Sequence, residues 1–452
     1  MSYQSINPTT QTCDASFPYA TKIMIKNGCE QLSGAFTSWS QTPLEKRKDA
    51  ISLLPNMLQA NAQAFAILMA KEMGKPIAQG LAEINKCIDL CHFYIKHIDT
   101  YLSPTPLTHK AFTYYQPIGT ILGVMPWNFP FWQVFRFAIP ALLAGNTVLL
   151  KPAPSVPACA LKIQALMNQV FSQQTPFHTL FLTHEDTKQL ITNPAVKGLS
   201  FTGSSSVGAL LAQRAATVYK PYVLECGGSD PFIVCQDADI NKAVDAAITS
   251  RFLNSGQTCI SAKRFFVQQD VHHAFVRQFK ERLQQLIVGD PLQSQTVIGP
   301  LAREDLLETL ERQFRESVAK GATVQVHSLK KPAKGFFFSP CLLSHVQPNM
   351  AVCLEETFGP LAVVSPFKTV EDGIAMANQS HYGLGASFWS ANEPHIQYAI
   401  QKLEAGNVFI NNSVRSFPDV PFGGIKYSGT GKELGKNGVT AFCYNKSVVM
   451  AD

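Results

Sequence analysis

The sequence lacks a long uninterrupted apolar run. Its longest apolar passage, residues 137–150, is broken by Pro140, Gly145 and Asn146. A membrane-spanning helix needs about 20 consecutive apolar residues, so we expect a buried helix, a turn and a strand here. Residues 1–5 also lack the basic and apolar regions of a signal peptide, and we expect none.

The sequence also lacks a basic stripe. Lysine and arginine total 38 against 32 aspartates and glutamates, and the formal charge of +6 is small for 452 residues. The nearest approaches to a cluster are residues 46–48 and 330–331. Because nucleic-acid binding needs a basic patch, we expect no nucleic-acid partner, and without an apolar span we expect no membrane partner.

The eleven cysteines form no pattern typical of a zinc site. Cys87 and Cys91 lie four positions apart, but no second pair or histidine cluster completes a ligand set. On a helix the two side chains share one face, which favours packed thiols, and we expect no bound metal. An odd number of cysteines in a long chain indicates a reducing, cytoplasmic setting.

Short β-rich runs alternate with longer helical stretches along the chain. Strands are predicted at 120–125, 147–150, 198–201, 222–225, 231–234 and 264–267, and helices at 131–143, 158–171, 206–218, 240–253 and 271–286. This alternation indicates crossover connections and a parallel sheet, hence an α/β fold. The first 100 residues are predicted to be mostly helical, and 109–116 and 441–450 to be exposed strands. The length predicts two or three domains.

Two reactive side chains lie among glycines. Glu225 is followed by Gly227 and Gly228, and Cys259, 34 positions later, is preceded by Gly256. Glycine lets the backbone turn sharply and a ligand approach closely. A thiolate is a strong nucleophile, and a carboxylate in a cleft can activate water. The pair therefore predicts covalent catalysis followed by hydrolysis.

Seven short polar or glycine-rich segments recur along the chain, several at the ends of predicted buried strands, where parallel sheets bind ligands. They are 126–130 (PWNFP), 151–154 (KPAP), 201–204 (FTGS), 225–228 (ECGG), 256–259 (GQTC), 355–360 (EETFGP) and 421–424 (PFGG). In this order and spacing they resemble the NAD(P)-dependent aldehyde dehydrogenase superfamily, from about residue 6 to the C-terminus. Residues 127–136 and 228–234 are most similar to the short bacterial succinate-semialdehyde dehydrogenases.

The resemblance implies catalytic roles for four residues. Cys259 attacks the aldehyde carbonyl to give a thiohemiacetal, and Asn128 stabilises the oxyanion together with the backbone N–H of Cys259. After hydride transfer, Glu225 activates the water that hydrolyses the thioester. Glu433 relays the proton outward, although Lys432 stands where the family usually has arginine. A surface helix residue is the alternative for Glu433.

The resemblance also implies a dinucleotide site without the GxGxxG pattern. Gly203, Ser204 and Gly208 join a predicted strand to a helix, where small residues and a free helix N-terminus suit a pyrophosphate. Ser204 is the implied phosphate contact. The other implied contacts are Lys151 at the adenosine ribose, Glu356 at the nicotinamide ribose, and Phe358 and Trp127 beside the nicotinamide.

Position 154 departs from the NAD-preferring members of the superfamily. Many of them have glutamate three residues after the lysine, where it binds the ribose hydroxyls, whereas this chain has Pro154. Without that glutamate, no carboxylate repels the 2′-phosphate of NADP, and Ser155 and Lys151 can contact the phosphate. We therefore expect both NAD and NADP to be accepted.

Arg136 is the predicted substrate anchor. It lies eight residues after Asn128 and, on a helix that begins near Phe131, faces the substrate tunnel. Succinate-semialdehyde dehydrogenases resemble this chain in having an arginine there, and arginine suits bidentate carboxylate binding. A surface or domain-interface arginine is the alternative. Arg415 and Ser416 are further candidates for the same anchor.

We expect an α/β fold with three parts. A Rossmann-like cofactor domain spans 1–100 and 118–227, a catalytic α/β domain spans 228–430, and a small β-flap of 101–117 and 431–452 joins subunits into a homodimer or homotetramer. The predicted reaction oxidises an aldehyde, and the resemblance favours succinate semialdehyde. The alternatives are another aldehyde, a thiol hydrolase or CoA-acylating enzyme, and a catalytically silent binding protein of this fold.

Overall fold

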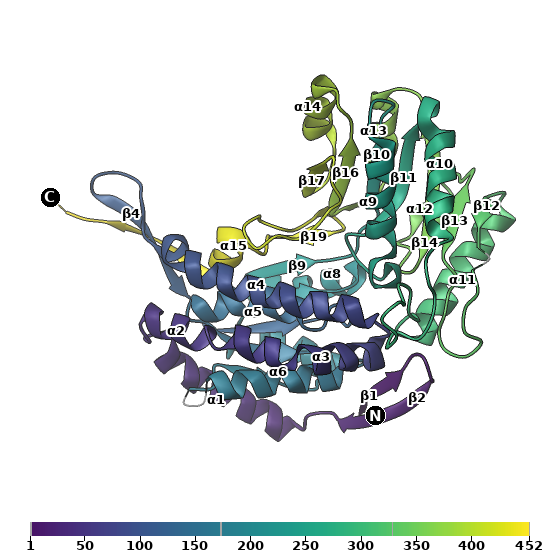
Figure 1. Ribbon diagram of the computed structural model, residues 1–452. Helices are drawn as coiled ribbons and strands as arrows, with labels where there is room; N and C mark the ends of the chain where they lie inside the picture. Colours follow the sequence, from purple (N-terminus) through teal and green to yellow (C-terminus); the bar gives the residue numbers. More distant parts are fainter. Residues whose placement is uncertain (1, 172–173, 328, 452) are drawn as a thin grey trace.

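The computed structural model describes residues 2–171, 174–327 and 329–451. Two large sheets, each flanked by helices, form the two halves of the molecule, and a narrow third sheet projects away from them (Figure 1). The expected α/β fold is confirmed. Among the described residues, no helix combines the length and apolar character needed to cross a membrane.

The first sheet is a doubly wound parallel sheet. Its strand order is β19-β9-β8-β5-β6-β7, with β19 antiparallel at one edge. The order reverses between β5 and β8, and such switch points open a crevice at the carboxyl ends of the strands. The bounds are β5 (Thr120–Val124), β6 (Thr147–Lys151), β7 (Phe177–Thr179), β8 (Val196–Thr202), β9 (Tyr222–Glu225) and β19 (Gly429–Thr430).

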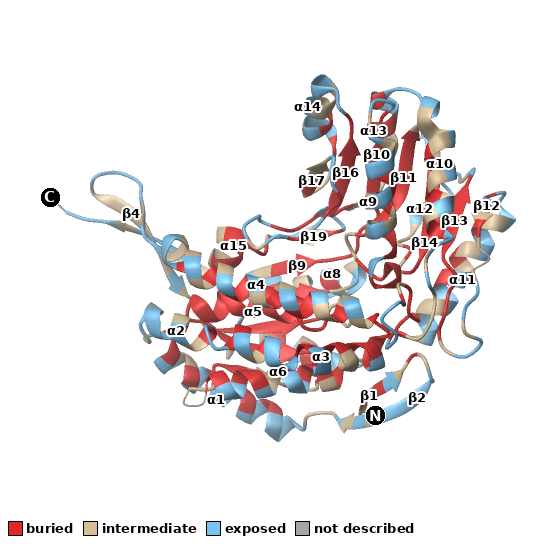
Figure 2. Ribbon diagram, viewed as in Figure 1, coloured by how far each residue is buried: buried red, intermediate tan, exposed pale blue. Residues whose placement is uncertain are grey.

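Helices cover this sheet, whose strands are mostly buried (Figure 2). An amphipathic helix such as α4 buries one face, and Cys87 and Cys91 on that face are packed thiols as expected. The helices are α1 (Lys22–Trp39), α2 (Leu44–Ile51), α3 (Leu54–Met73), α4 (Ile77–Leu102), α5 (Trp132–Leu143), α6 (Pro157–Val170), α7 (His184–Thr192), α8 (Ser205–Ala216) and α15 (Gly435–Thr440).

The mostly helical prediction for the first 100 residues missed a β-hairpin. β1 (Ser2–Asn7) and β2 (Thr12–Pro18) pair antiparallel before α1 begins. The hairpin is anchored by Tyr3, whose hydroxyl lies within hydrogen-bond distance of the carbonyl oxygens of Leu182 (3.0 Å) and Pro152 (3.2 Å). It therefore supports the loop that follows β6.

The second sheet has the order β12-β13-β14-β11-β10-β16-β17 and is parallel except for β12. Its strands are β10 (Asp230–Val234), β11 (Ala262–Gln268), β12 (Thr323–Val326), β13 (Cys341–Ser344), β14 (Leu361–Phe367), β16 (Gly385–Trp389) and β17 (Asn407–Ile410). Its helices are α9 (Ile240–Phe252), α10 (Gln269–Leu283), α11 (Glu304–Ala319), α12 (Ala351–Leu354), α13 (Val370–Asn378) and α14 (Glu393–Lys402).

The third sheet joins segments far apart in the sequence. β20 (Cys443–Val449), β4 (Ala111–Pro117) and β3 (Thr105–Pro106) lie side by side, with β20 at an edge (Figure 1). The residue boundaries of the three expected parts stay predictions. At the junctions, β19 joins the first sheet, and α15 packs against α4 and α5.

Two buried carboxylates hold helix N-termini. Glu83 on α4 accepts from the backbone N–H groups of Phe131 and Trp132, both at 2.9 Å, where α5 begins, and it forms an ion pair with Lys75. Glu72 on α3 does the same for the start of α6, through the N–H groups of residues 158 and 159. Carboxylates at helix N-termini satisfy free N–H groups and oppose the helix dipole. Glu83 thereby fixes the 126–130 turn before α5.

We expect Glu83→Gln to lower the free energy of unfolding by about 3–5 kcal/mol, because it leaves the Lys75 cation buried without a counter-charge. The two side chains are 1% and 0% exposed. Urea unfolding measures the change. The double variant Glu83→Gln/Lys75→Met removes both charges and should recover part of the loss. A single variant as stable as the wild type contradicts this account.

Candidate active site

Two cavities meet at Cys259. The larger, of about 720 Å³, lies at the carboxyl ends of the first sheet's strands and is also lined by Glu356 and Phe358. The smaller, of about 460 Å³, lies between α4, α5, the segment before Cys259 and residues 413–418. Cys259 and Gln133 line both cavities. A ligand in either one therefore reaches the same thiol.

The Cys259 loop is held in an unusual conformation. Asn254, Ser255 and Gly256 have φ angles of 54°, 56° and 75°. Left-handed backbone costs free energy at residues other than glycine, and such strain is typical of functional loops. The oxygen of Gly359 lies only 2.4 Å from the position of a β-carbon on Gly256, so no side chain fits there. The hydroxyl of Ser255 accepts from the N–H of Gly299 at 2.9 Å.

The sequence rule that ligand-binding segments follow the strands holds only for the first sheet. The segments after β5, β6, β8 and β9 lie at carboxyl ends, as expected. The 256–259 segment instead precedes β11, so placing it at a carboxyl end is wrong, and the 355–360 segment likewise precedes β14. The physical reason is that the second sheet presents the amino ends of its strands to the carboxyl ends of the first.

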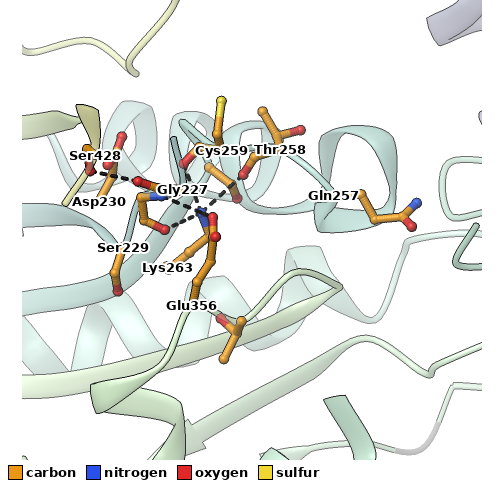
Figure 3. Close-up of polar contacts among 12 residues, drawn as sticks. Gly227, Ser229, Asp230, Gln257, Thr258, Cys259, Lys263, Glu356 and Ser428 are labelled. Carbon is orange, nitrogen blue, oxygen red and sulfur yellow. Dashed lines mark hydrogen bonds and ion pairs between the residues drawn. The ribbon is translucent and has the colours of Figure 1, made fainter. Parts of the chain in front are cut away.

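Lys263 ties the Cys259 loop to Glu356. From β11, its ammonium lies within hydrogen-bond distance of the carbonyl oxygens of Gly228 (2.6 Å), Thr258 (3.1 Å) and Cys259 (2.8 Å) and of Oε1 of Glu356 (2.9 Å), so its three N–H donors are shared among four acceptors. Figure 3 shows Lys263 between Cys259 and Glu356. The sulfur of Cys259 points away from this cluster (Figure 3). Sequence analysis missed Lys263. A lysine inside a strand of buried residues was the available signal.

Burial raises the pKa of Cys259 to about 11. The positive charges of Arg136 and Lys263 lower it, while the carboxylates of Glu356 and Glu225 raise it. Burial therefore prevails over the favourable charges, and the thiol is protonated at neutral pH. A nearby base is needed to form the thiolate nucleophile.

Glu225 is the candidate for that base. It ends β9, lines the larger cavity with Cys259, and neither carboxylate oxygen has a hydrogen-bond partner among the described residues. Burial raises its pKa well above the ordinary value, Arg136 lowers it and Glu433 raises it again. A buried carboxyl with raised pKa and no partner is suited to taking up and releasing a proton.

Asn128 lies against the Cys259 loop. The side-chain Nδ2 of Asn128 donates to the backbone carbonyl oxygen of Gln257 at 3.0 Å. The backbone carbonyl oxygen of Asn128 accepts from Nδ2 of Asn254 at 2.8 Å. A side-chain amide has two N–H donors, so one remains for a ligand. Asn128 also lines the larger cavity, which agrees with the predicted oxyanion contact.

Arg136 and Glu433 contact each other in an ion pair. Glu433 also accepts from the Ser200 hydroxyl at 3.0 Å, and Nη2 of Arg136 donates to the Thr202 hydroxyl at 3.4 Å. Both residues are buried, and Glu433 precedes α15. The surface alternatives for Arg136 and Glu433 are therefore wrong. The anchor and relay roles stay predictions, but each now involves a charge that is already paired.

Six of the eight predicted cofactor contacts line the larger cavity. They are Trp127, Lys151, Gly203, Ser204, Glu356 and Phe358. Ser155 and Gly208 do not line it. The Ser155 hydroxyl is buried without a hydrogen-bond partner among the described residues. A β-carbon on Gly208 would lie 2.8 Å from the Cys226 sulfur, so this glycine lets α8 pack closely on the sheet. Cofactor contact stays a prediction for both.

The larger cavity fits a dinucleotide. Within the described residues, the ammonium of Lys151 forms no hydrogen bond or ion pair, and burial lowers its pKa to about 8. The α8 N-terminus at Ser204 has no side-chain cap, so its N–H groups are free for a phosphate. Trp127 and Phe358 pack edge to face at 5.7 Å, near Cys259. His184 and Lys188, which sequence analysis missed, also line this cavity.

The smaller cavity contains the predicted substrate contacts and one cation that sequence analysis missed. Arg136, Arg415 and Ser416 all line it, with Arg415 exposed and Ser416 buried. Lys86 of α4 also lines it and donates to the Ser416 hydroxyl at 2.6 Å. A lysine on the mostly apolar, uncapped helix α4 gave no distinct signal in the sequence.

Comparisons with known proteins agree with this geometry. The aldehyde dehydrogenase family model matches residues 1–448. A probable NADP(+) succinate-semialdehyde dehydrogenase of Synechocystis is 40% identical over 454 residues, which cover 100% of both chains. The Escherichia coli NAD(P)+ succinate semialdehyde dehydrogenase Sad is 37% identical over 447 residues, 98% of this chain and 97% of its own.

A solved structure shares the whole architecture. Succinic semialdehyde dehydrogenase from Streptococcus pyogenes, in complex with NADP+, superposes with a TM-score of 0.96 and 31% sequence identity, and 100% of each chain is covered. The resemblance seen in the sequence is confirmed over the length of the chain. The protein belongs to the aldehyde dehydrogenase family.

Proposed function

We propose that the protein oxidises succinate semialdehyde to succinate with NAD(P)+. The observation that carries this proposal is the meeting of two cavities at Cys259, one suited to a dinucleotide and the other lined by cations. A cation-lined cavity favours an aldehyde that carries a carboxylate. The relatives named for succinate semialdehyde support the same substrate.

The chain's own residues carry the covalent steps. Glu225 accepts the proton of the Cys259 thiol, and the thiolate adds to the aldehyde carbon to form a thiohemiacetal. The free N–H of Asn128 and the backbone N–H of Cys259 stabilise the oxyanion. A bound nicotinamide would supply the hydride acceptor, and Cys259 would then hold the acyl group as a thioester.

Hydrolysis completes the reaction. Glu225 first releases the proton taken from the thiol and then removes a proton from water, which attacks the thioester carbon, and the Cys259 thiolate leaves as the carboxylate product forms. The placement of Glu225 on the cavity that holds Cys259 favours hydrolysis over transfer to CoA. Glu433, paired with Arg136, is the proposed outlet for the proton.

An aldehyde panel tests the substrate. With NADP+, we expect kcat/KM for succinate semialdehyde to exceed that for butanal, the same carbon chain without the carboxylate, by at least about tenfold. NADPH absorbance gives the rates, and chromatography identifies succinate. Equal kcat/KM values for the two aldehydes would contradict the substrate assignment but not the reaction class.

Pro154 is proposed to permit NADP. It lines the larger cavity beside Lys151 and brings no carboxylate there. We expect Pro154→Glu to lower kcat/KM for NADP+ by about 10–100-fold, because the new charge repels the 2′-phosphate, and to change that for NAD+ much less. Pro154→Gln, of similar size but uncharged, is the control. A glutamate variant that uses NADP+ as well as the glutamine variant does would overturn the idea.

We propose a homodimer or homotetramer joined through the third sheet, in the cytoplasm. β20 is an edge strand of largely exposed residues, including Tyr444 and Val449, which are 57% and 76% exposed. Such an edge supports pairing with a second copy. All eleven cysteines are free thiols, which supports a reducing compartment.

A further inference from the structure

We infer that Lys86, rather than Arg136 alone, binds the carboxylate of the substrate, with the hydroxyl of Ser416 beside it. Lys86 lies on α4, whose face packs against α5 (Figure 1). It lines the smaller cavity together with Cys259. The inference deepens the proposed function and rests on it for the identity of the substrate.

The side chain of Lys86 is held in place by two contacts. Its ammonium lies 4.0 Å from the centre of the Trp132 ring, within the range of a cation–π interaction, and 2.6 Å from the hydroxyl oxygen of Ser416. An ammonium has three N–H donors. One is used by Ser416, so others remain available to a ligand. The cation is therefore oriented before a ligand arrives.

Lys86 has no carboxylate partner among the described residues. Glu83 lies one turn away on the same helix, but its oxygens are used by Lys75 and by the N–H groups that begin α5. A charge held partly out of water without a counter-ion is costly, and a substrate carboxylate supplies that counter-ion. The half-buried side chain leaves the cation open to the cavity.

Arg136 is the weaker candidate for this contact. Its guanidinium already forms an ion pair with Glu433 and lies 5.2 Å from the centre of the Phe422 ring. Because Glu433 already neutralises much of the positive charge of Arg136, a substrate carboxylate would be attracted to Arg136 more weakly. Arg415 is exposed, where solvent screens its charge. Of these three cations, only Lys86 is both half-buried and without a carboxylate partner among the described residues.

Charged and titratable groups around Lys86 set its behaviour with pH. Burial lowers the pKa of Lys86 to about 8, and the charge of Arg136 lowers it too. The ratio of kcat/KM for succinate semialdehyde to that for butanal should therefore fall above about pH 8, because the titration of Cys259 affects both aldehydes and cancels. The groups that face Lys86 are Glu83, Cys87, Asp89, Arg136, Cys259 and Arg415.

Lys86→Met, which keeps an apolar stem against Trp132, tests the inference. We expect kcat/KM for succinate semialdehyde to fall about 10–100-fold, mainly through KM, and that for butanal to fall less than about threefold. Lys86→Arg should restore much of the loss and keep the ratio level above pH 8. Lys96→Met, an exposed lysine on the same helix, is the control for surface charge.

Competitive inhibition by succinate separates this inference from the proposed function. Succinate should inhibit butanal oxidation by the wild type, and its inhibition constant should rise about 10–100-fold in Lys86→Met. This result supports the Lys86 site even if the wild type does not prefer succinate semialdehyde. The site is overturned by an unchanged inhibition constant, or by equal losses for both aldehydes.

Discussion

Cys259→Ala should lower the rate of aldehyde oxidation by on the order of 10⁵-fold, because no other thiol of the described residues lines both cavities. NADPH formation measures the loss. Cofactor binding should survive, since alanine removes only the sulfur from the boundary between the cavities. Intrinsic fluorescence of Trp127, which packs against Phe358, reports that binding independently of turnover.

Cys353 offers a closely matched control. Both thiols are half-buried, and burial raises the pKa of each to about 11. They differ in position, because Cys353 lies on α12 and lines neither cavity. Cys353→Ala should therefore stay within about twofold of the wild type. A loss of activity in this variant as large as that in Cys259→Ala would mean that thiol removal acts through stability.

Glu225→Gln should impair both proton transfers assigned to Glu225, the one from the Cys259 thiol and the one from water. We expect steady-state turnover to fall about 10²–10⁴-fold, because a glutamine cannot take a proton from water. If acylation remains faster than hydrolysis, one equivalent of NADPH per active site forms in a burst. Mass spectrometry then detects the acyl group on Cys259. Linear NADPH formation without an acylated protein would mean that the loss falls mainly on thiol deprotonation and would contradict a rate-limiting role of Glu225 in hydrolysis.

The pH profile gives a second readout for Glu225. Burial raises its pKa, so the carboxylate form that acts as base is lost at a higher pH than for an ordinary glutamate. Hydrolysis should therefore accelerate as the pH rises through this raised pKa. The acceleration should be absent in Glu225→Gln and retained in Glu433→Gln. Identical profiles in the wild type and Glu225→Gln would exclude Glu225 as the titrating base.

The regular part of the fold was predictable from the sequence. Buried parallel strands read as continuous apolar runs, and the predicted strand at 222–225 matches β9 to the residue. Asp239, a residue type favoured at helix N-caps, accepts from the N–H of Lys242 at the start of α9. Cys259 and Glu225 were found because reactive side chains among glycines form a local pattern.

The remaining features of the fold and site depend on contacts between residues far apart in the sequence, which no local sequence pattern reveals. The N-terminal hairpin is short and polar on its exposed side, so its residues carry no strong strand signal. Lys86 and Lys263 gain their roles from partners far along the chain, Ser416 and Glu356. The pairing of Arg136 with Glu433 joins positions almost 300 apart, and it changes what each can do.

The facing edges of the two sheets each contribute part of the proposed catalytic residues. The proposed nucleophile, Cys259, belongs to the half built on the second sheet, whereas the proposed base and oxyanion donor, Glu225 and Asn128, belong to the half built on the first. Neither half contains a working set of groups. Any hinge movement between the halves changes the separation of thiol and base directly, so the alignment of the two bodies is itself a condition for turnover. Substitutions at the interface between the two halves can then abolish turnover although the proposed catalytic residues are unchanged.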